Sequence, residues 1–323
     1  MEDEQVGKIG GVRYWDGVYR GGHNEEVQMF VLRALRRLLR EVDIRIERER
    51  HGAKAVVPTG NGRAAQIEKF LRDVEMAGDG ERAYLEVHLS RLVRTLSLVP
   101  PNGGRALELG SYVYTAAALE RVLGYSSVRG AYYSATPGNE RKVLKIAGQP
   151  DFACEIDLFD AERHPYPYPG SSFDLVLCCE LIEHLLQDPM HLLFECHRIL
   201  AEGQLLLLTT PNTASFTSVA CALHGWRNPQ LYSVYPAAGN GGTPHVREYT
   251  PRELVDAVTA AGFEVEALFT ERIAGCDEGP WVKDFLERAG FDTSLRGEQI
   301  YCLARRRSDL PRERFPKWLY EGA

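Results

Sequence analysis

The stretch RALELGSYVYTAAAL, residues 105–119, decides how this chain folds. A short apolar run ends in Glu108 and Gly110, and a segment with helical character follows. This order is typical of the strand-to-helix corner at which α/β proteins bind nucleotides, because glycine lets the backbone approach a ligand and the amides of the next helix point at it. Such corners usually carry two or three glycines, whereas this one carries a single glycine. The alternative is a tight packing turn that binds nothing.

From residue 105 onward, segments with strand character alternate with segments with helical character. The predicted strands are 105–109, 128–133, 152–156, 173–179, 204–210, 264–269 and 299–305. The predicted helices between them are 115–123, 139–147, 189–200 and 251–261. This alternation predicts a doubly wound, Rossmann-like α/β sheet that binds its ligand at the carboxyl ends of the strands.

The first hundred residues have a different, helical pattern. Residues 24–50 predict one long amphipathic helix with mixed charges, either a homodimer element or a lid over the site, and two shorter helices follow at 64–76 and 81–98. The predicted domains are a helical extension over 1–100, a core over 101–307 with an insertion at 213–244, and a tail over 308–323.

The composition narrows the classes of partner. Of the 323 residues, 38 are basic and 45 acidic, so the net charge is −7 and we do not expect a nucleic-acid partner. No apolar run is long enough to span a membrane, and the acidic N-terminus lacks the apolar segment of a secretory signal. The seven cysteines include no CxxC pair, which predicts reduced, mostly buried thiols in a cytoplasmic protein.

Acidic residues follow two of the predicted strands where ligands are expected. Asp157 comes just after the strand at 152–156, where it would accept a hydrogen bond from an exocyclic amine such as that of adenine, or else cap a turn. In SSFDLVLCCELIEHLLQDP, residues 171–189, Glu180 ends an apolar strand, and Glu183 and His184 follow on a short turn. If that turn is helical, these three side chains share one face.

Two later stretches carry further signals. RILAEGQLLLLTTPN, residues 198–212, ends a helix, turns at a glycine and forms a buried strand. HVREYTPRELVDAVTAAGF, residues 245–263, begins with His245 and continues into a helix. That helix is predicted to start at a capping box formed by Thr250 and Glu253.

In order and spacing, these stretches resemble the class I S-adenosylmethionine-dependent methyltransferases, and most closely a bacterial group that acts on small molecules and glycans. The resemblance covers about residues 105–305, and its most specific parts are 173–212 and 245–263. It implies S-adenosylmethionine as the cofactor and a seven-stranded sheet whose last strand is antiparallel. It also implies the cofactor-binding residues, which are Glu108, Gly110, Ser111, Ser134, Asp157, Leu158 and Glu180.

The chain departs from the family pattern at two places. Tyr112 and Tyr114 stand where the first cofactor motif usually has its second and third glycines. The second strand ends in Tyr132, Tyr133 and Ser134, where the family usually has an acid for the ribose hydroxyls. The cofactor would therefore bind in an altered pose, or weakly, or not at all.

Methyl transfer needs a base when the acceptor is a hydroxyl. The protein has to hold the acceptor in line with the sulfonium methyl group and remove a proton. His184 and His245 are the candidate bases, with Glu183 as a third candidate catalytic residue, because imidazole accepts protons near neutral pH. The alternative is that His184 bonds a neighbouring carbonyl group and that His245 only orders its loop.

Three functions remain open. The first is methyl transfer to a hydroxyl of a small molecule or glycan. The second follows from a resemblance of Glu180, Glu183, His184 and His245 to the Mg²⁺ or Mn²⁺ site of small-RNA 2′-O-methyltransferases. We expect no metal, because the same residues occur in metal-free bacterial relatives. The third is a catalytically inactive binding or scaffold protein whose cofactor pocket is filled by tyrosines.

Overall fold

The chain divides into two units, Met1–Gly52 and Ala53–Ala323. The computed structural model describes residues 8–9, 12–13, 60, 62–76, 78–225, 228, 244–273 and 280–321. In the first unit these are two short antiparallel strands, β1 (Lys8–Ile9) and β2 (Val12–Arg13). The helix predicted over residues 24–50 and most of the predicted insertion lie outside the described residues.

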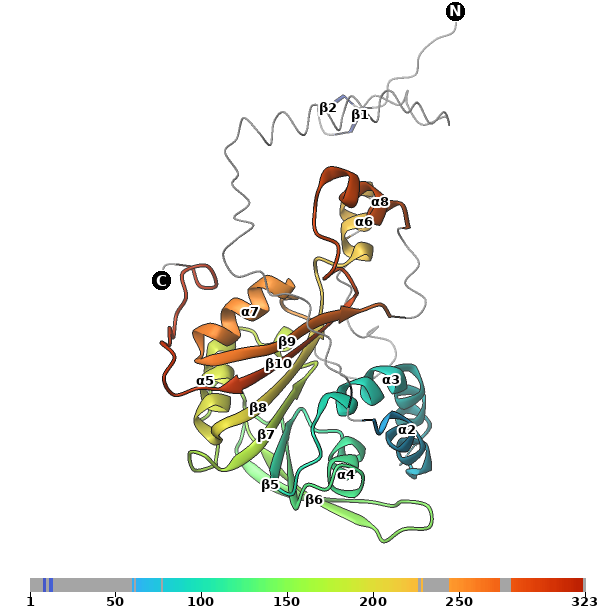
Figure 1. Cartoon of the computed structure of the whole chain (residues 1–323), viewed down its shortest axis with the longest axis vertical. Helices are drawn as coiled ribbons and strands as arrows, with labels where there is room; N and C mark the ends of the chain where they lie inside the picture. Colours follow the sequence, from blue (N-terminus) through green and yellow to red (C-terminus); the bar gives the residue numbers. More distant parts are fainter. Residues whose placement is uncertain are drawn as a thin grey trace, which may run out of the picture. The chain divides into compact units, whose positions relative to one another are not determined.

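The second unit is built on one eight-stranded sheet with the order β5-β6-β4-β3-β7-β8-β10-β9 (Figure 1). Strands β6, β4, β3, β7 and β8 are mutually parallel, and β10 is antiparallel to both of its neighbours. The predicted Rossmann-like sheet with an antiparallel last strand is therefore confirmed. The strands are β3 (Arg105–Leu109), β4 (Ser127–Tyr132), β5 (Gly138–Leu144), β6 (Phe152–Leu158), β7 (Phe173–Cys179), β8 (Leu200–Pro211), β9 (Phe263–Glu271) and β10 (Gln299–Arg306).

Strand β5 is the eighth strand, and it corrects the prediction of a helix at 139–147. Its sequence, GNERKVL, contains good helix formers, but seven residue pairs join it to β6 in an antiparallel ladder at the edge of the sheet. Local propensity is a weak preference that strand pairing overrides. The connection between the parallel strands β4 and β6 is therefore a strand.

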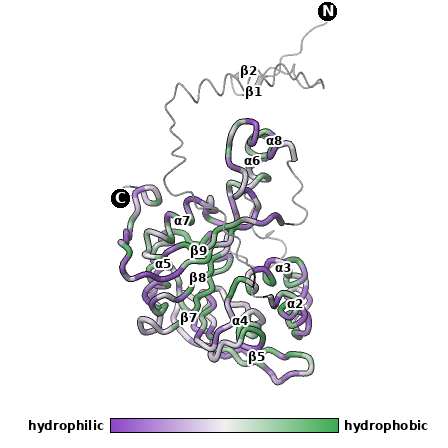
Figure 2. The backbone as a smooth tube through the Cα atoms, in the orientation of Figure 1, coloured by the Kyte–Doolittle hydropathy of each residue, from purple (hydrophilic) through white to green (hydrophobic). Residues whose placement is uncertain are grey.

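Helices cover both faces of the sheet. One face is covered by α2 (Ala64–Asp73), α3 (Asp79–Leu98) and α4 (Val113–Arg121), whose apolar side chains form a core with those of the strands. The other face is covered by α5 (Pro189–Ile199) and α7 (Pro251–Ala260). Helix α7 begins with the predicted capping box of Thr250 and Glu253, which is confirmed. Figure 2 shows the hydrophobic residues gathered along the central strands.

Helix α2 packs against α3 and α4 and reaches the segment after β5. Val74, at its carboxyl end, forms an antiparallel bridge with Ile146 beyond β5. Two backbone hydrogen bonds flank this bridge, from Glu75 N to Lys145 O and from Ala147 N to Asp73 O, each 3.0 Å long. Residues 73–75, which precede the alternating strands and helices of the core, thus pair with residues 145–147 beyond β5.

Two smaller features complete the second unit. Helices α6 (Phe216–His224) and α8 (Pro280–Ala289) share a small apolar cluster of their own. The C-terminal tail docks on the start of α5, where Asp188 accepts hydrogen bonds from Arg314 Nη1 at 2.8 Å and from the Tyr320 hydroxyl at 2.6 Å. None of the helices in the described part of the chain has both the length and the apolar character needed to cross a membrane.

Candidate active site

The buried side chain of Glu108 holds the glycine corner between β3 and α4 in shape. Gly110 has a φ of +70°, in the left-handed region that favours glycine. The carboxylate of Glu108 is buried and accepts hydrogen bonds from Ser111 Oγ at 2.8 Å and from the Thr115 hydroxyl. Burial raises the pKa of Glu108 to about 7. Of the predicted cofactor residues at this corner, Glu108 and Ser111 therefore bond each other and hold the loop in shape.

Tyr112 and Tyr114, which stand where the family has glycines, form a stack of aromatic rings with Tyr84, and we call these three residues the tyrosine stack. Tyr84 and Tyr112 have ring centroids 5.1 Å apart, and Tyr112 and Tyr114 are 5.4 Å apart. The Tyr112 hydroxyl donates to the Tyr84 hydroxyl at 2.9 Å. Because Tyr84 belongs to α3, the tyrosine stack ties that helix to the glycine corner.

A small cavity, which we call the donor cavity, lies between α3 and the carboxyl ends of the central strands. Helix α3 contributes Arg91, Leu92, Thr95 and Leu96, and the opposite wall is formed by Glu108, Gly110, Tyr112, Thr115, Leu177, Cys179, Glu180 and Thr209. Its volume is about 20 Å³, which holds roughly one water molecule. Sites for nucleoside-sized ligands are usually ~300–1,000 Å³. The chain's own side chains therefore close the donor cavity in this conformation.

Glu180 and Arg91 meet across the donor cavity. Arg91 Nη1 lies 2.8 Å from Glu180 Oε2, in an ion pair whose side chains are 12% and 19% exposed. The other oxygen, Glu180 Oε1, accepts hydrogen bonds from Thr209 Oγ1 at 2.8 Å and from Gln299 Nε2 at 2.7 Å. Glu180 itself has a φ of +51°, which is uncommon for a residue with a side chain.

Asp157, the predicted contact for adenine, is enclosed by side chains of the protein. Its Oδ1 accepts from Arg129 Nη2 at 2.7 Å and from Asn139 Nδ2 at 3.0 Å. Its Oδ2 accepts from Arg129 Nε at 2.8 Å and from the Tyr168 hydroxyl at 2.7 Å. Burial acts to raise the pKa of Asp157, but these hydrogen bonds outweigh it and hold the pKa below its usual range. Adenine would have to replace one of these donors, so the contact stays a prediction.

The end of β4, where the family binds ribose, carries exposed aromatic rings. Tyr132 and Tyr133 are 52% and 68% exposed. Ser134 turns back on its own loop, where its Oγ donates to Thr136 O at 2.7 Å and accepts from Thr136 N at 3.2 Å. Leu158 is half-buried and packs against the core. The cofactor roles of Ser134 and Leu158 remain predictions.

Glu183 lies beyond β7 on a single 3₁₀ turn, Ile182–His184. Its side chain is fully buried, and its Oε2 accepts from Thr210 Oγ1 at 2.9 Å. Its Oε1 has no hydrogen-bond partner among the described residues. Burial, followed by the nearby charge of Glu180, raises the pKa of Glu183 well above its usual range. The turn begins only after Glu180, which faces Arg91, so the expected shared face of all three residues is wrong.

Glu183, His184 and His245 come together, and we call them the histidine–glutamate cluster. One ligand atom from each lies within 4.8 Å of the others, and His184 Nε2 is 4.0 Å from Glu183 Oε1. His184 Nδ1 bonds Pro244 O at 3.1 Å, and His245 Nδ1 bonds Glu248 Oε1 at 2.9 Å. Because a carbonyl or carboxylate oxygen only accepts, each Nδ1 carries hydrogen and the Nε2 of the neutral ring carries the lone pair.

Arg91 was not among the residues predicted from the sequence. A signal for it was available, because Tyr84, His88, Arg91 and Thr95 form a polar stripe at helical spacing beside the leucine stripe of α3. The helix at 81–98 was predicted without considering what these polar side chains face. Thr209 and Gln299 were not among the predicted site residues either. Each lies near the end of its strand, and only the pairing of β8 with β10 and β7 brings both of them to Glu180.

Comparison with known proteins decides the family. A family model described as a methyltransferase domain matches residues 82–268, which is more than half of the chain. The chain belongs to this methyltransferase family. The predicted family and its methyl donor, S-adenosylmethionine, are thereby confirmed.

Similar proteins carry names that agree with this family. A probable S-adenosylmethionine-dependent methyltransferase of Mycolicibacterium smegmatis is 30% identical over 112 residues, which is 34% of this chain and 36% of that protein. Another, from Mycobacterium tuberculosis, is 28% identical over 136 residues, which is 42% of this chain and 41% of that protein. The chain thus spans about two fifths of the length of these curated relatives. A solved Thermotoga maritima protein, a possible histamine N-methyltransferase, is 19% identical with a TM-score of 0.43, covering 75% of this chain and 99% of its own.

The residues that line the donor cavity have chemistry suited to S-adenosylmethionine, but the cavity is too small to hold it in this conformation. A guanidinium, a carboxylate and a glycine corner are suitable partners for an amino-acid group and a cationic sulfur. A space of about 20 Å³ cannot hold the adenosyl group. S-adenosylmethionine would fit here only after side chains of α3 and of the glycine corner had moved.

Proposed function

We propose that this chain transfers a methyl group from S-adenosylmethionine to a hydroxyl of a small molecule or glycan. The observation that carries the proposal is the histidine–glutamate cluster, whose Glu183 follows Glu180 of the donor cavity by three residues. The donor supplies a methyl group on a positively charged sulfur, whose departure needs no acid. The protein has to position the acceptor oxygen and take its proton.

His245 is the best-supported base in the cluster. Its Nδ1 donates to the carboxylate of Glu248, which fixes the ring and stabilises the imidazolium that forms when Nε2 accepts a proton. His184 is oriented less strongly, by the carbonyl of Pro244. The backbone of Glu183 holds the segment that carries His245, because the Glu183 carbonyl accepts hydrogen bonds from Val246 N at 2.8 Å and from Arg247 N at 3.2 Å.

The test is the release of S-adenosylhomocysteine in the presence of a panel of sugars, phenols and hydroxy acids. With an accepted substrate, His245→Gln should slow transfer by about 10²–10⁴-fold, the usual contribution of a general base. Glu248→Gln should slow it less, with an altered pH profile. His224→Gln, an exposed histidine of α6, is the matched control and should leave the rate unchanged. Full activity of His245→Gln would contradict the assignment of this base.

The same cluster supports a second candidate, the metal-dependent RNA 2′-O-methyltransferase. Histidines that bind metals usually donate their other ring N–H to a carbonyl or carboxylate, as His184 and His245 do here. Glu183 adds a buried oxygen without a hydrogen-bond partner among the described residues, and Mg²⁺ or Mn²⁺ accepts such ligands. Three of the four residues in the resemblance gather here, while the fourth, Glu180, faces Arg91.

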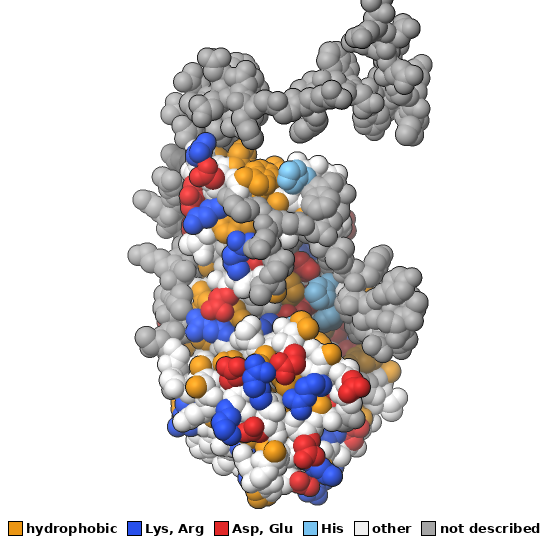
Figure 3. Space-filling view, turned by 90° about the vertical axis from the view of Figure 1, so that its right-hand side faces the viewer, with side chains coloured by type: hydrophobic (Ala, Val, Ile, Leu, Met, Phe, Trp, Pro, Cys, Tyr) orange, Lys and Arg blue, Asp and Glu red, His pale blue; other side chains and the backbone are white. Residues whose placement is uncertain are grey.

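Titration with Mn²⁺ separates the two candidates. Micromolar binding that Glu183→Gln abolishes would favour the metal-dependent reaction, and absence of binding would favour the metal-free base. The face of the molecule in Figure 3 carries basic and acidic side chains interspersed, and the net charge of −7 is unlike the basic charge typical of RNA-binding proteins. The RNA acceptor is therefore the second choice.

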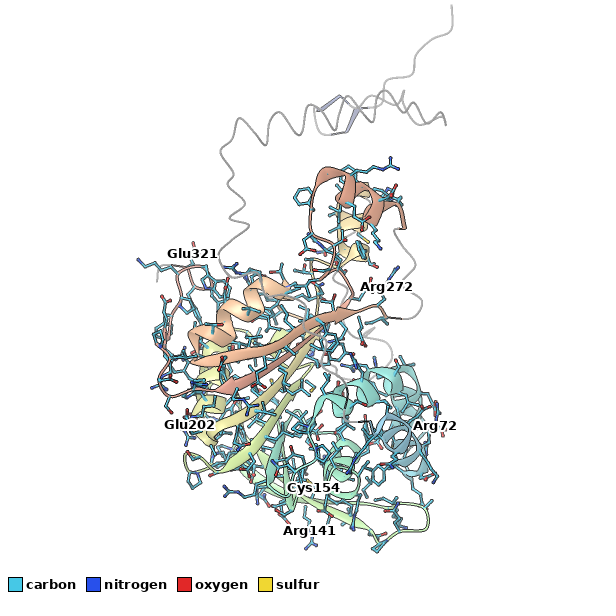
Figure 4. All side chains as sticks on the ribbon, viewed as in Figure 1. Arg72, Arg141, Cys154, Glu202, Arg272 and Glu321 are labelled. Carbon is cyan, nitrogen blue, oxygen red and sulfur yellow. The ribbon has the colours of Figure 1, made fainter. Side chains whose placement is uncertain are left out.

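The cytoplasmic location and the homodimer remain part of the proposal. Five of the six described cysteines are buried, and buried cysteines that are mostly reduced are typical of a reducing compartment. Figure 4 shows one of them, Cys154, in the interior, while Arg72 and Arg141 point outward. Sedimentation of the purified chain would establish whether it forms a dimer.

A further inference from the structure

The C-terminal tail lies beside α5 (Figure 1) and is fastened there to Asp188, four residues beyond His184 of the histidine–glutamate cluster. The carboxylate of Asp188 accepts hydrogen bonds from both terminal nitrogens of Arg314, one on each oxygen, and from the Tyr320 hydroxyl at 2.6 Å. It also caps α5 by accepting from His191 N at 3.1 Å. We call Asp188, Arg314 and Tyr320 the tail anchor. A bidentate pair of this kind fixes the relative orientation of its two partners.

Further contacts hold the tail anchor in place. The guanidinium groups of Arg312 and Arg314 lie 5.8 and 5.5 Å from the centroid of the Phe194 ring on α5, within the range of cation–π attraction. Burial acts to raise the pKa of Asp188, but the hydrogen bonds from Arg314 and Tyr320 outweigh it and hold the pKa below its usual range. Asp188 is therefore ionised at neutral pH, and its pair with Arg314 persists there.

The short segment between His184 and Asp188 is held at its far end from two sides. On one side, the buried carboxylate of Glu162 accepts from the backbone N–H groups of Gln187 and Asp188, the second at 2.6 Å. On the other side is the tail anchor. Because only three residues separate His184 from Asp188, a displacement of Asp188 changes the position of the 3₁₀ turn that carries His184.

The position of that turn decides how the two histidines of the cluster face each other. Their rings are 4.9 Å apart between centroids, at an interplanar angle of 75°. The bond from His184 Nδ1 to Pro244 O, 3.1 Å long, keeps the lone pair of the neutral ring on Nε2. His184 keeps this bond only while the turn stays beside the segment that carries His245.

We propose that the tail anchor positions the turn that carries Glu183 and His184, so that the C-terminal tail supports the active site. The inference rests on the proposed function, since it takes the histidine–glutamate cluster as the place where the acceptor loses its proton. Arg314 and Tyr320 are positioning residues, because they act through Asp188. Without them the eight-stranded sheet remains, whereas the bond from His184 to Pro244 loosens.

The spectrum of the His184 ring reports this positioning without any substrate. In the full chain with ¹⁵N-labelled histidine and a chelator present, His184 should carry its hydrogen on Nδ1, and His184→Gln identifies its signals. The double variant Arg314→Met, Tyr320→Phe should shift these signals toward the Nε2–H form that an unconstrained imidazole favours. Tyr320→Phe alone keeps the ring and the ion pair and should shift them less. Melting temperatures verify that each variant is folded.

Arg312→Met is the matched control for the tail anchor. Arg312 belongs to the same tail and lies over the same Phe194 ring, but it makes no hydrogen bond to Asp188 among the described residues. This variant should keep the wild-type signals of His184. If the folded double variant also keeps them, or if Arg312→Met shifts them equally, the tail only stabilises the fold and the inference is overturned.

Transfer kinetics test the consequence for the reaction. With an accepted substrate, the double variant should lower kcat by up to about 10²-fold, the effect of a misplacement of about 1 Å, and leave the KM for S-adenosylmethionine unchanged. An effect confined to KM would contradict the inference. If the wild-type chain releases no S-adenosylhomocysteine with any acceptor while the His184 signals still shift, the proposed function fails and the positioning by the tail anchor stands.

Discussion

The carboxyl ends of β6 and β7 each carry a buried acid, and their hydrogen bonding differs. At β6, both oxygens of Asp157 are occupied by two donors each, one of them a guanidinium that binds both oxygens. At β7, Glu183 has one hydroxyl donor on one oxygen and no partner among the described residues on the other. The pKa of Asp157 is lowered, whereas that of Glu183 is raised.

The difference separates acids that stabilise the fold from acids that are available to a ligand. A carboxylate with every acceptor position filled has to break an existing bond before it can bind anything. A buried carboxyl with an empty position gains by binding a proton, a metal ion or a substrate group. Glu108, at the end of β3, is intermediate, because it accepts two bonds that come from neutral hydroxyls.

The largest expected effect is loss of stability in Asp157→Ala. The change leaves Arg129 without its partner and two further donors unsatisfied, so unfolding free energy should fall by about 3 kcal/mol, the lower end for a broken buried pair, because Arg129 is partly exposed. Glu155→Ala, on the same strand with a 3.8 Å pair to Arg141, is the control and should cost at most about 0.5 kcal/mol. Urea denaturation measures both. If the Asp157→Ala protein is stable but no longer binds S-adenosylmethionine, Asp157 is instead a residue that contacts the cofactor.

The second effect is a pH dependence of stability from Glu108. Its pKa in the folded chain is about 7, against about 4.3 for an unfolded glutamate. Between these values the folded state holds a proton that the unfolded state has lost, so stability is greatest below the lower value and falls as pH rises through 7. Relative to Glu108→Gln, the wild type should lose at most about 3 kcal/mol between pH 4.5 and 8. Equal pH profiles would show that Glu108 is not desolvated.

A smaller effect is expected from Tyr168→Phe, which removes one of the four donors to Asp157. A hydrogen bond to a charged group contributes about 1.5–3 kcal/mol, and the three remaining donors keep Asp157 ionised, so a loss of about 1.5 kcal/mol is expected. Tyr166→Phe is the matched control, because its hydroxyl donates to the backbone oxygen of Ala161 at 3.2 Å. A larger loss in the control would show that the bonds around Asp157 contribute less than the comparison implies.

The smallest effect on stability is expected from Glu183→Gln. The amide oxygen can still accept the hydrogen bond from Thr210. The substitution also removes a carboxyl group whose ionisation is unfavourable, so the free energy of unfolding should change by less than about 1 kcal/mol. For the metal-dependent candidate, Mn²⁺ binding should nevertheless fall, because the substitution removes a carboxylate ligand. A loss of stability as large as that of Asp157→Ala would mean that Glu183 stabilises the fold as Asp157 does and is not available to a ligand.

The sequence by itself determined the fold class, most strand positions and the strand ends at which the site lies. Strands β3 and β7 were predicted with the bounds that the structure shows. The capping box before α7 was also read correctly. These are local properties, because hydrophobic period, turn residues and caps depend on a few neighbouring residues.

Only the tertiary structure decided what those acids contact. Residues 139–147 contain helix formers, yet pairing with β6 makes a strand of residues 138–144, and Ile146 forms a bridge with Val74 of the segment after α2. The pairing of Arg91 with Glu180 and the enclosure of Asp157 by Arg129 and Tyr168 join residues of different elements, beyond the reach of a local sequence pattern. Whether a buried carboxylate is closed or available depends on such contacts, and the local pattern around it carries no information about them.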